Sequence, residues 1–415
     1  MKSHISIILT IVIGIVGCNK FDEPVSPEDL IPRQPIPLTR SQQEFANNGN
    51  NAFALSLFKT LATTDKNMVI SPLGVSFTLG MIDNGAVAYT KEEIENTLGY
   101  NSESTSDLNS FCKTILDNAK KIDPSTTIEI ANAAVFNDRL LTLRDDYKKS
   151  LRNNYYTEVC SKDFKKDDVA GYINSWCKNN THNTIPGILS SQPKDNTAVI
   201  FLNAIYFKGI WSSQFKKSNT RKEDFSDIYG QIHHVNMMRQ ESSFYYGRFE
   251  DLCSFVCLPF GNQAYSMLII LPDTSKSLSD LRSGLCVDMW NKMNKSQHNT
   301  KVDVKIPSFK AEYDASLKEV LQQLGCRSTF DPVSAQFGLM SKDHVWVDDV
   351  SQKAIIAIDE QGSEATAVTT STMMSYTGTD PVERFAEFHA DRPFIYAITE
   401  VSTGAIFFIG QYTGK

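Results

Sequence analysis

The stretch DEQGSEATAVTTSTMMSYTGTDP, residues 359–381, decides how this 415-residue chain is organised. It follows the apolar run AIIAI, residues 354–358, which predicts a buried strand. No charged residue lies between Ala365 and Thr379, and almost no large side chain precedes Met373. Surface loops are usually marked by Gly, Pro, Asn and Asp, whereas Thr, Ser, Ala and Val tolerate or favour a strand. The composition therefore predicts a strand-like segment held outside its sheet.

Downstream of this stretch lies the motif FHADRPF, residues 388–394. Together the two features resemble the reactive-centre loop of the serpin family. The resemblance implies that a protease cuts the loop and that the part before the cut inserts into a large sheet, carrying the acylated protease along. Insertion requires small or β-branched side chains in the hinge at the start of the loop. The expected hinge residues are Glu360, Gly362, Ser363, Glu364, Ala365, Thr366, Ala367 and Val368. The alternative is a flexible loop that is merely small and polar.

The scissile bond can be placed in two ways. Counting seventeen residues from Glu360, as the family does, gives Tyr376-Thr377, whereas counting back from Phe388 gives a bond near Thr379. The remaining alternatives are Met373 and Met374. A protease selects its bond mainly by the preceding side chain, so these residues favour chymotrypsin-like, elastase-like or subtilisin-like serine proteases. No Lys or Arg lies between Glu360 and Glu383, which disfavours trypsin-like enzymes. Cysteine proteases, which some serpins trap, remain an alternative target class.

Two further stretches carry the resemblance. NMVISPLGVS, residues 67–76, and TAVIFLNAIYFKGIW, residues 197–211, match the family's pattern around the opening of its large sheet. The resemblance assigns four residues to the regions called the shutter and the breach, where the sheet parts and the loop enters: Ser71, Asn203, Trp211 and Gln352. The simpler interpretations are a helix N-cap for Ser71, before a proline at the first helical turn, and a satisfied core amide for Asn203.

The sequence also departs from the family pattern at the shutter. Gly74 replaces the second serine that is usual there, and Gln352 stands where many serpins have a histidine. Losing the histidine removes the one shutter group that would titrate near neutral pH. We therefore expect the opening to differ in stability or rate.

The N-terminus predicts export. Residues 1–17 resemble a signal peptide, and IVGC, residues 15–18, resembles a bacterial lipobox that would place a lipid on Cys18. Residues 18–40 contain five prolines and predict an extended tether. We expect an outer-membrane or cell-surface lipoprotein that touches the membrane only through this lipid. The alternative is a plain signal peptide whose cleavage site happens to precede a cysteine.

The remaining residues, 41–415, predict one serpin domain with its loop at about 360–384. The expected fold is α+β, with three β-sheets and about eight or nine helices. Phe53, Leu57, Phe58 and Leu61 follow helical spacing, and Asp314 is expected to cap a helix that ends at Gly325. The chain has 41% hydrophobic residues, enough for a core without disulfides. Besides Cys18, the seven cysteines predict buried thiols, although one disulfide remains an alternative.

Composition and motifs also limit the function. The net charge is −7 with scattered basic residues, so neither a nucleic-acid nor a polybasic membrane surface is expected. The chain has no nucleophile elbow, P-loop, zinc-protease helix or dinucleotide turn, which argues against an enzyme. We expect no cofactor and no metal site, and a monomer that binds target proteases through a covalent acyl complex. The competing hypothesis is a serpin-fold binding or storage protein that inhibits nothing.

Overall fold

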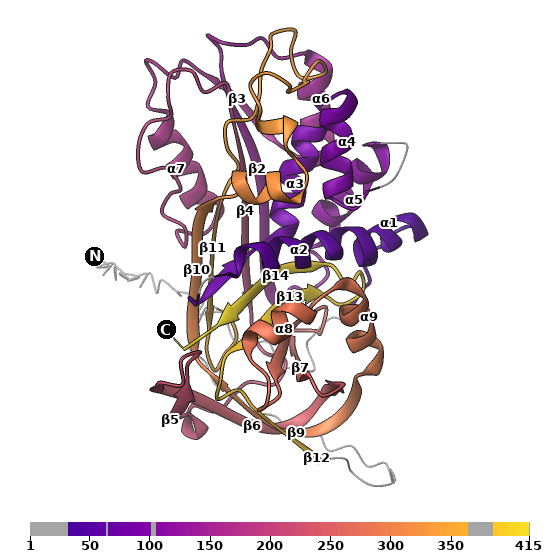
Figure 1. Ribbon diagram of the computed structural model, residues 1–415, viewed down its shortest axis with the longest axis vertical. Helices are drawn as coiled ribbons and strands as arrows, with labels where there is room; N and C mark the ends of the chain where they lie inside the picture. The colour runs from indigo at the N-terminus through magenta and orange to yellow at the C-terminus, as the bar shows by residue number, and fades with distance from the viewer. Residues whose placement is uncertain (1–31, 64, 101–104, 364–384, 415) are drawn as a thin grey trace, which may run out of the picture.

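The computed structural model describes residues 32–63, 65–100, 105–363 and 385–414. Their strands form three hydrogen-bonded sheets, and the helices gather mainly at one end and along one side of the long strands (Figure 1). Ten α-helices are present in these ranges, and α1 continues through a π-helical turn into α2, which gives nine α-helical segments besides two short 3-10 helices. The expectation of an α+β fold with three sheets and eight or nine helices is confirmed.

The largest sheet has nine strands and forms the lower part of the molecule in Figure 1. Its path runs from β1 to β12, with β5 attached to β6. The β7–β8 hairpin lies at the centre of the path, and the parallel pair of β9 and β12 closes one end. The strands are β1 (Met68–Ile70), β14 (Ile406–Tyr412), β13 (Phe394–Glu400), β8 (Tyr265–Pro272), β7 (Cys253–Phe260), β6 (Ile232–Phe249), β9 (His298–Pro307), β12 (Phe385–His389) and β5 (Arg221–Ser226).

Two smaller sheets stand beside each other along the long axis. One joins β3 (Glu158–Lys162), β2 (Thr126–Asn137) and β4 (Val199–Gly209), and the other joins β10 (Phe309–Ser316) to β11 (Ser351–Ile358). Strand β4 is apolar on both faces because each face is covered. Phe201, Ile205 and Phe207 belong to the main core, whereas Leu202 and Ala204 pack in a second cluster under α7.

Several of the helices cover the two faces of β2 and β4. Helix α3 packs along the core face together with α5 and α6, and α7 lies on the opposite face (Figure 1). The helices are α1 (Arg40–Glu44), α2 (Asn51–Leu61), α3 (Pro72–Asp83), α4 (Ala88–Thr97), α5 (Thr105–Asn118), α6 (Asp145–Tyr155), α7 (Val169–Asn180), α8 (Leu278–Gly284), α9 (Val287–Ser296) and α10 (Lys318–Leu324). The helix expected from Phe53 to Leu61 is α2.

One capping prediction is wrong. Asp314 lies inside strand β10, where it pairs with Lys353 of β11 and binds its ammonium group at 2.8 Å. The strand continues to Ser316, so α10 begins only at Lys318, after Leu317. Cross-strand pairing therefore outweighed the local preference of aspartate for a helix cap. The end of the helix at Gly325 is as expected.

The packed domain begins slightly before Ser41. Ile36 is buried, its amide donates to Ser402, and Arg33 donates to the carbonyl of Gln263. Thr39 forms a capping box with Gln42 at the start of α1. The last residues of the proline-rich segment thus lie against the domain, while the signal peptide and Cys18 fall outside the described residues.

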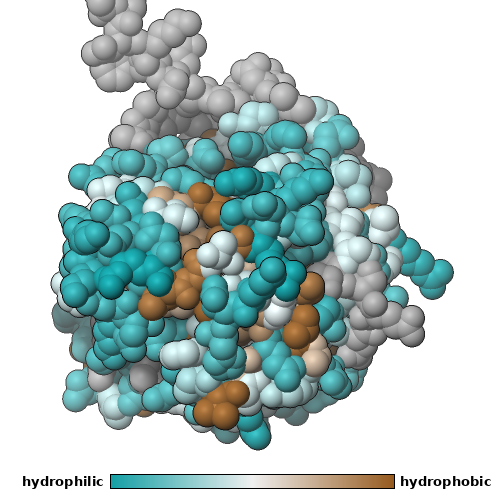
Figure 2. Space-filling view, turned by 90° about the horizontal axis from the view of Figure 1, so that it is seen from above, coloured by the Kyte–Doolittle hydropathy of each residue, from teal (hydrophilic) through white to brown (hydrophobic). Residues whose placement is uncertain are grey.

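The surface carries few exposed large apolar side chains. Seen from the end of the molecule above α4 and α6, hydrophilic residues surround separate apolar patches (Figure 2). The seven cysteines from Cys112 to Cys326 are all free thiols, and four of them are buried. In the described ranges we find no helix long and apolar enough to cross a membrane. These same ranges contain no group of three or more His, Cys, Asp or Glu side chains placed to hold a metal ion.

Candidate functional site

The candidate site is the boundary between the two small sheets. Strand β4 pairs with β2 on one side, and β11 pairs with β10 on one side. Within the described part of the chain no backbone ladder joins β4 to β11. Among the described residues no strand lies between the facing edges of β4 and β11, and such edges have backbone groups ready to pair with an added strand. The two strands approach each other along part of this boundary, so an added strand would require them to move apart.

The segment after β11 already enters this boundary. It turns back at Asp359, whose amide donates to the carbonyl of Gly362 at 2.9 Å. Gly362 then bridges Ile210 beyond β4, and Ser363 bridges Ile358 at the end of β11, both in antiparallel sense. The Ser363 amide donates to the Gly209 carbonyl at 2.8 Å, and the Gly209 amide donates to the Ser363 hydroxyl at 2.9 Å. Ser363 thus occupies the first position of a strand between β4 and β11.

Only glycine fits at position 362. Its φ is +152°, a value that side chains disfavour, and a Cβ atom there would lie 1.9 Å from the carbonyl oxygen of Gly209. The chain therefore approaches β4 closely enough to form the bridge because residue 362 lacks a side chain.

Several groups hold the turn before Gly362 in place. The Trp211 indole donates to the Asp359 carbonyl at 2.9 Å, and the Trp211 amide donates to the Gln361 carbonyl at 2.7 Å. The indole is buried and stacks on Phe260, with ring centroids 4.4 Å apart. Trp211, assigned to the breach from the sequence, therefore holds the turn that follows β11.

Glu360 is anchored by residues that the sequence did not indicate. The Phe215 amide donates to its carbonyl at 3.0 Å, and the Thr220 hydroxyl donates to its carboxylate at 2.8 Å. Thr220 is 140 residues away in the chain and directly precedes β5. No local motif marks such a contact, so only the tertiary structure shows it.

Ser71 joins helix α3 to both β11 and β14. It is the N-cap of α3, with Pro72 as the first helical residue, as the simpler sequence interpretation predicted. Its hydroxyl donates to the carbonyl of Phe407 at 2.8 Å. The side chain of Gln352 accepts from the Ser71 amide at 2.9 Å and donates to the Ser71 carbonyl at 2.8 Å. A glutamine satisfies both backbone groups at once, because its amide is donor and acceptor together.

Asn203 links β4 to its neighbour β2. Its amide donates to the Asn132 side chain at 2.8 Å, and Asn132 donates to the Tyr155 carbonyl at the same distance. The side-chain carbonyl oxygen of Asn203 points at Gly74 of α3, where an added Cβ atom would lie 2.2 Å from it. The glycine that replaces the family's usual serine therefore makes room for Asn203.

The loop residues expected to react are not part of this geometry. Glu364 to Val368, the bond Tyr376-Thr377 and the alternatives Met373, Met374 and Thr379 all lie outside the described residues. The structure brings together Glu360, Gly362, Ser363 and Trp211 at one end of the boundary. It places Ser71, Asn203 and Gln352 together about midway along it.

A family model described as "Serpin (serine protease inhibitor)" matches residues 48–414. The chain belongs to the serpin family. This serpin is 32% identical over 370 residues to Iripin-2 of Ixodes ricinus, with 87% of this chain and 91% of the relative covered. The family expectation drawn from the loop, the shutter stretches and FHADRPF is confirmed.

Solved serpin structures resemble this one closely. The native-state structure of tengpin, a thermophilic serpin, superposes with a TM-score of 0.82 at 28% identity, covering 92% of this chain and 97% of that one. Human thyroxine-binding globulin in complex with its hormone has a TM-score of 0.79 at 25% identity, covering 89% and 98%. The fold is therefore shared with both of these solved structures.

Proposed function

We propose that this serpin is an irreversible suicide-substrate inhibitor of proteases and not an enzyme. The observation that carries the proposal is Ser363, which already pairs with both β4 and β11. After cleavage of the loop, the residues that follow Ser363 would extend this pairing and form a strand between the two sheets. The protease, still attached as an acyl-enzyme, would be carried along.

The two bridges set the register of that strand. In an antiparallel pair, the partner's residue number falls by one for each residue added. Counting from Ser363 opposite Ile358, residue 369 would lie beside Gln352. Counting from Gly362 opposite Ile210, the same residue would lie beside Asn203. The two bridges thus agree on one register, in which a threonine reaches the polar shutter. Residues 365 and 367, both alanines, would face the core, because their partners Ile356 and Ala354 are buried. Small side chains fall where space is tightest.

Insertion is also energetically reasonable. A strand of roughly ten residues would gain on the order of 10 kcal/mol at about 1 kcal/mol per net hydrogen bond, before packing and strain are counted. That sum is comparable to the stability of a whole domain. A gain of this order would favour the inserted state over the cleaved but uninserted one.

Two alternative functions are each supported by a specific observation. The likeness to thyroxine-binding globulin, solved with its hormone, motivates a serpin that binds a ligand and inhibits nothing. The small hinge argues against it, since a non-inhibitory serpin is expected to carry a charged or bulky residue between 365 and 368. Cysteine proteases are the second alternative, because the same loop could form a thioester.

The first prediction concerns the reaction with chymotrypsin. We expect a band of inhibitor plus protease that survives denaturing electrophoresis, and a released C-terminal fragment whose mass corresponds to a start at Thr377. Tyr376→Ala should lose most of this reaction, because the apolar pocket of the protease loses its aromatic side chain. Met374→Ala is the matched control and should react normally.

Other outcomes lead to other conclusions. A fragment that begins at Ser375, or beyond Gly378, moves the reactive bond to the alternatives. Clean cleavage without a stable complex, for every serine and cysteine protease tried, would leave the binding hypothesis.

We further propose that the protein is an exported lipoprotein anchored through Cys18, which would place the inhibitor at the cell envelope. Several acyl chains on one cysteine anchor a protein firmly, whereas one chain does not. The expected result is that Cys18→Ala moves the protein from the membrane to the soluble fraction of cells, while Cys286→Ala, a change at an exposed thiol, leaves it in the membrane. Retention of the Cys18→Ala variant in the membrane would contradict the anchor.

A further inference from the structure

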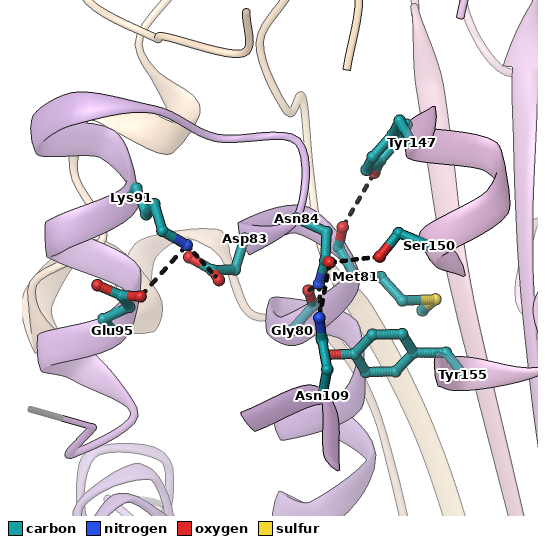
Figure 3. Close-up of polar contacts among 10 residues, drawn as sticks. All are labelled: Gly80, Met81, Asp83, Asn84, Lys91, Glu95, Asn109, Tyr147, Ser150 and Tyr155. Carbon is teal, nitrogen blue, oxygen red and sulfur yellow. Dashed lines mark hydrogen bonds and ion pairs between the residues drawn. The ribbon is translucent and has the colours of Figure 1, made fainter. Parts of the chain in front are cut away.

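Helix α3 is attached to both halves of the divided sheet. At its N-terminus, Ser71 binds Gln352 of β11. Along its C-terminal half, a network of partly buried polar side chains joins it to α5 and α6 (Figure 3). This network continues to β2 and β4 and so reaches the opposite side of the boundary.

The centre of the network is a pair of asparagines. Asn84, the C-cap of α3, donates to the Gly80 carbonyl at 2.7 Å and to Asn109 of α5 at 2.8 Å, and Asn109 donates back at 2.9 Å. Ser150 of α6 donates to Asn84 at 2.6 Å. The adjacent Asp83 binds Lys91 of α4 at 2.8 Å (Figure 3). One end of α3 is thus fixed to three other helices.

Tyr155 connects this network to the sheet. Its hydroxyl donates to Asn109 at 2.7 Å, and its backbone carbonyl accepts from Asn132 of β2 at 2.8 Å. The ring is fully buried against α3, where a Cβ atom on Gly80 would lie 2.4 Å from the hydroxyl. Burial raises the pKa of this phenol well above its usual value, so the hydroxyl remains a donor.

We propose that Asn132, Tyr155 and Asn109 are positioning residues that control how readily the boundary between β4 and β11 widens. The inference rests on the proposed function, in which a new strand must enter there. The three side chains hold the β3-β2-β4 sheet against α3, α5 and α6. They act through the shutter residue Asn203, which is bonded to Asn132.

The connectivity gives the direction of the effect. β4 is tied to β2 along their ladder and through Asn203, and β2 is tied to α6 and α5 through Asn132 and Tyr155. β11 is tied to the other end of α3 through Gln352. Separating β4 from β11 therefore strains a closed path of bonds, and removing one bond from that path should make separation easier.

The test compares two buried tyrosines. Tyr155→Phe removes the hydroxyl bonded to Asn109, and the control Tyr396→Phe removes a hydroxyl of β13 bonded to the Met68 carbonyl at 3.1 Å, inside the nine-stranded sheet and off the path that joins β4 to β11. The probe is a fluorescent peptide with the sequence of residues 364–376, whose incorporation is followed on native gels. Tyr155→Phe should accept the peptide about fivefold faster, the factor that one net hydrogen bond provides. Tyr396→Phe should match the wild type in rate.

Denaturant titrations measure the free energy of unfolding of both variants. Each variant loses one hydrogen bond, so a similar loss of stability with a different rate of peptide incorporation would indicate positioning and not a general loss of stability. Asn109→Ala, which removes the acceptor, should reproduce the effect, and Asn132→Ala should combine with Tyr155→Phe non-additively. Equal acceleration in both tyrosine variants, or none in Tyr155→Phe, would overturn the proposal. Peptide incorporation needs no protease, so a failure of protease trapping leaves this result independent.

Discussion

Replacing Ala367 by arginine is expected to convert the protein from an inhibitor into a substrate. In the register set by the bridges at Gly362 and Ser363, residue 367 would lie between Ala354 and Ile205, both buried on the core face. An unpaired guanidinium there costs several kcal/mol, a substantial part of the gain from insertion. The strand would enter more slowly than the acyl-enzyme is hydrolysed.

The matched control places the same side chain on the other face. Residue 364 would lie beside Ala357 and Lys208, which are only partly buried, and it already carries a charge in the native sequence. Glu364→Arg should therefore trap protease nearly as well as the wild type. Denaturing gels measure the ratio of complex to cleaved inhibitor. As a second measurement, the melting temperature after loop cleavage should rise in the wild type and in Glu364→Arg but much less in Ala367→Arg. Equal trapping by both variants would show that the register is wrong.

Restoring the family's serine at position 74 is expected to destabilise this serpin. Intrinsic helix propensity alone favours serine over glycine by about 0.5 kcal/mol. However, a Cβ atom at residue 74 would lie 2.2 Å from the Asn203 carbonyl oxygen, and overpacking of this kind costs about 1–3 kcal/mol. The clash outweighs the propensity, so Gly74→Ser should lower the free energy of unfolding by roughly 1–2 kcal/mol in denaturant titrations.

A second change tests whether Asn203 is the cause. Asn203→Ala removes the clashing oxygen, so the double variant should be more stable than the sum of the two single losses predicts. Additive losses would instead place the strain elsewhere in α3. The same experiment shows whether Gly74 and Asn203 act as one unit in the shutter.

Much of the site follows from short stretches of sequence. The apolar run before Asp359 predicted β11, and Ser71 before Pro72 predicted the start of α3. In each case the signal is local, a run of side chains or a capping pair, and local signals survive folding when tertiary contacts agree with them.

The remainder depends on long-range pairing. Thr220 binds Glu360 across 140 residues, and Asn132 binds Asn203 across 71. Thr220 lies before a strand and Asn132 lies within one, and neither position carries a distinctive sequence pattern. The two residues were therefore not predicted as partners of Glu360 and Asn203. Asp314 shows the reverse error, since a plausible local cap was replaced by a cross-strand ion pair with Lys353.

The bridges at Gly362 and Ser363 also bear on how an added strand would form, because starting a strand and extending it have different costs. Forming the first pair of a new strand fixes backbone dihedrals with few hydrogen bonds in return, whereas each later residue adds bonds to an existing ladder. Here the first pair exists before any protease arrives. Under the proposed function, the activation barrier to insertion would therefore lie in elongation of the strand and not in its initiation, because its first pair is already formed.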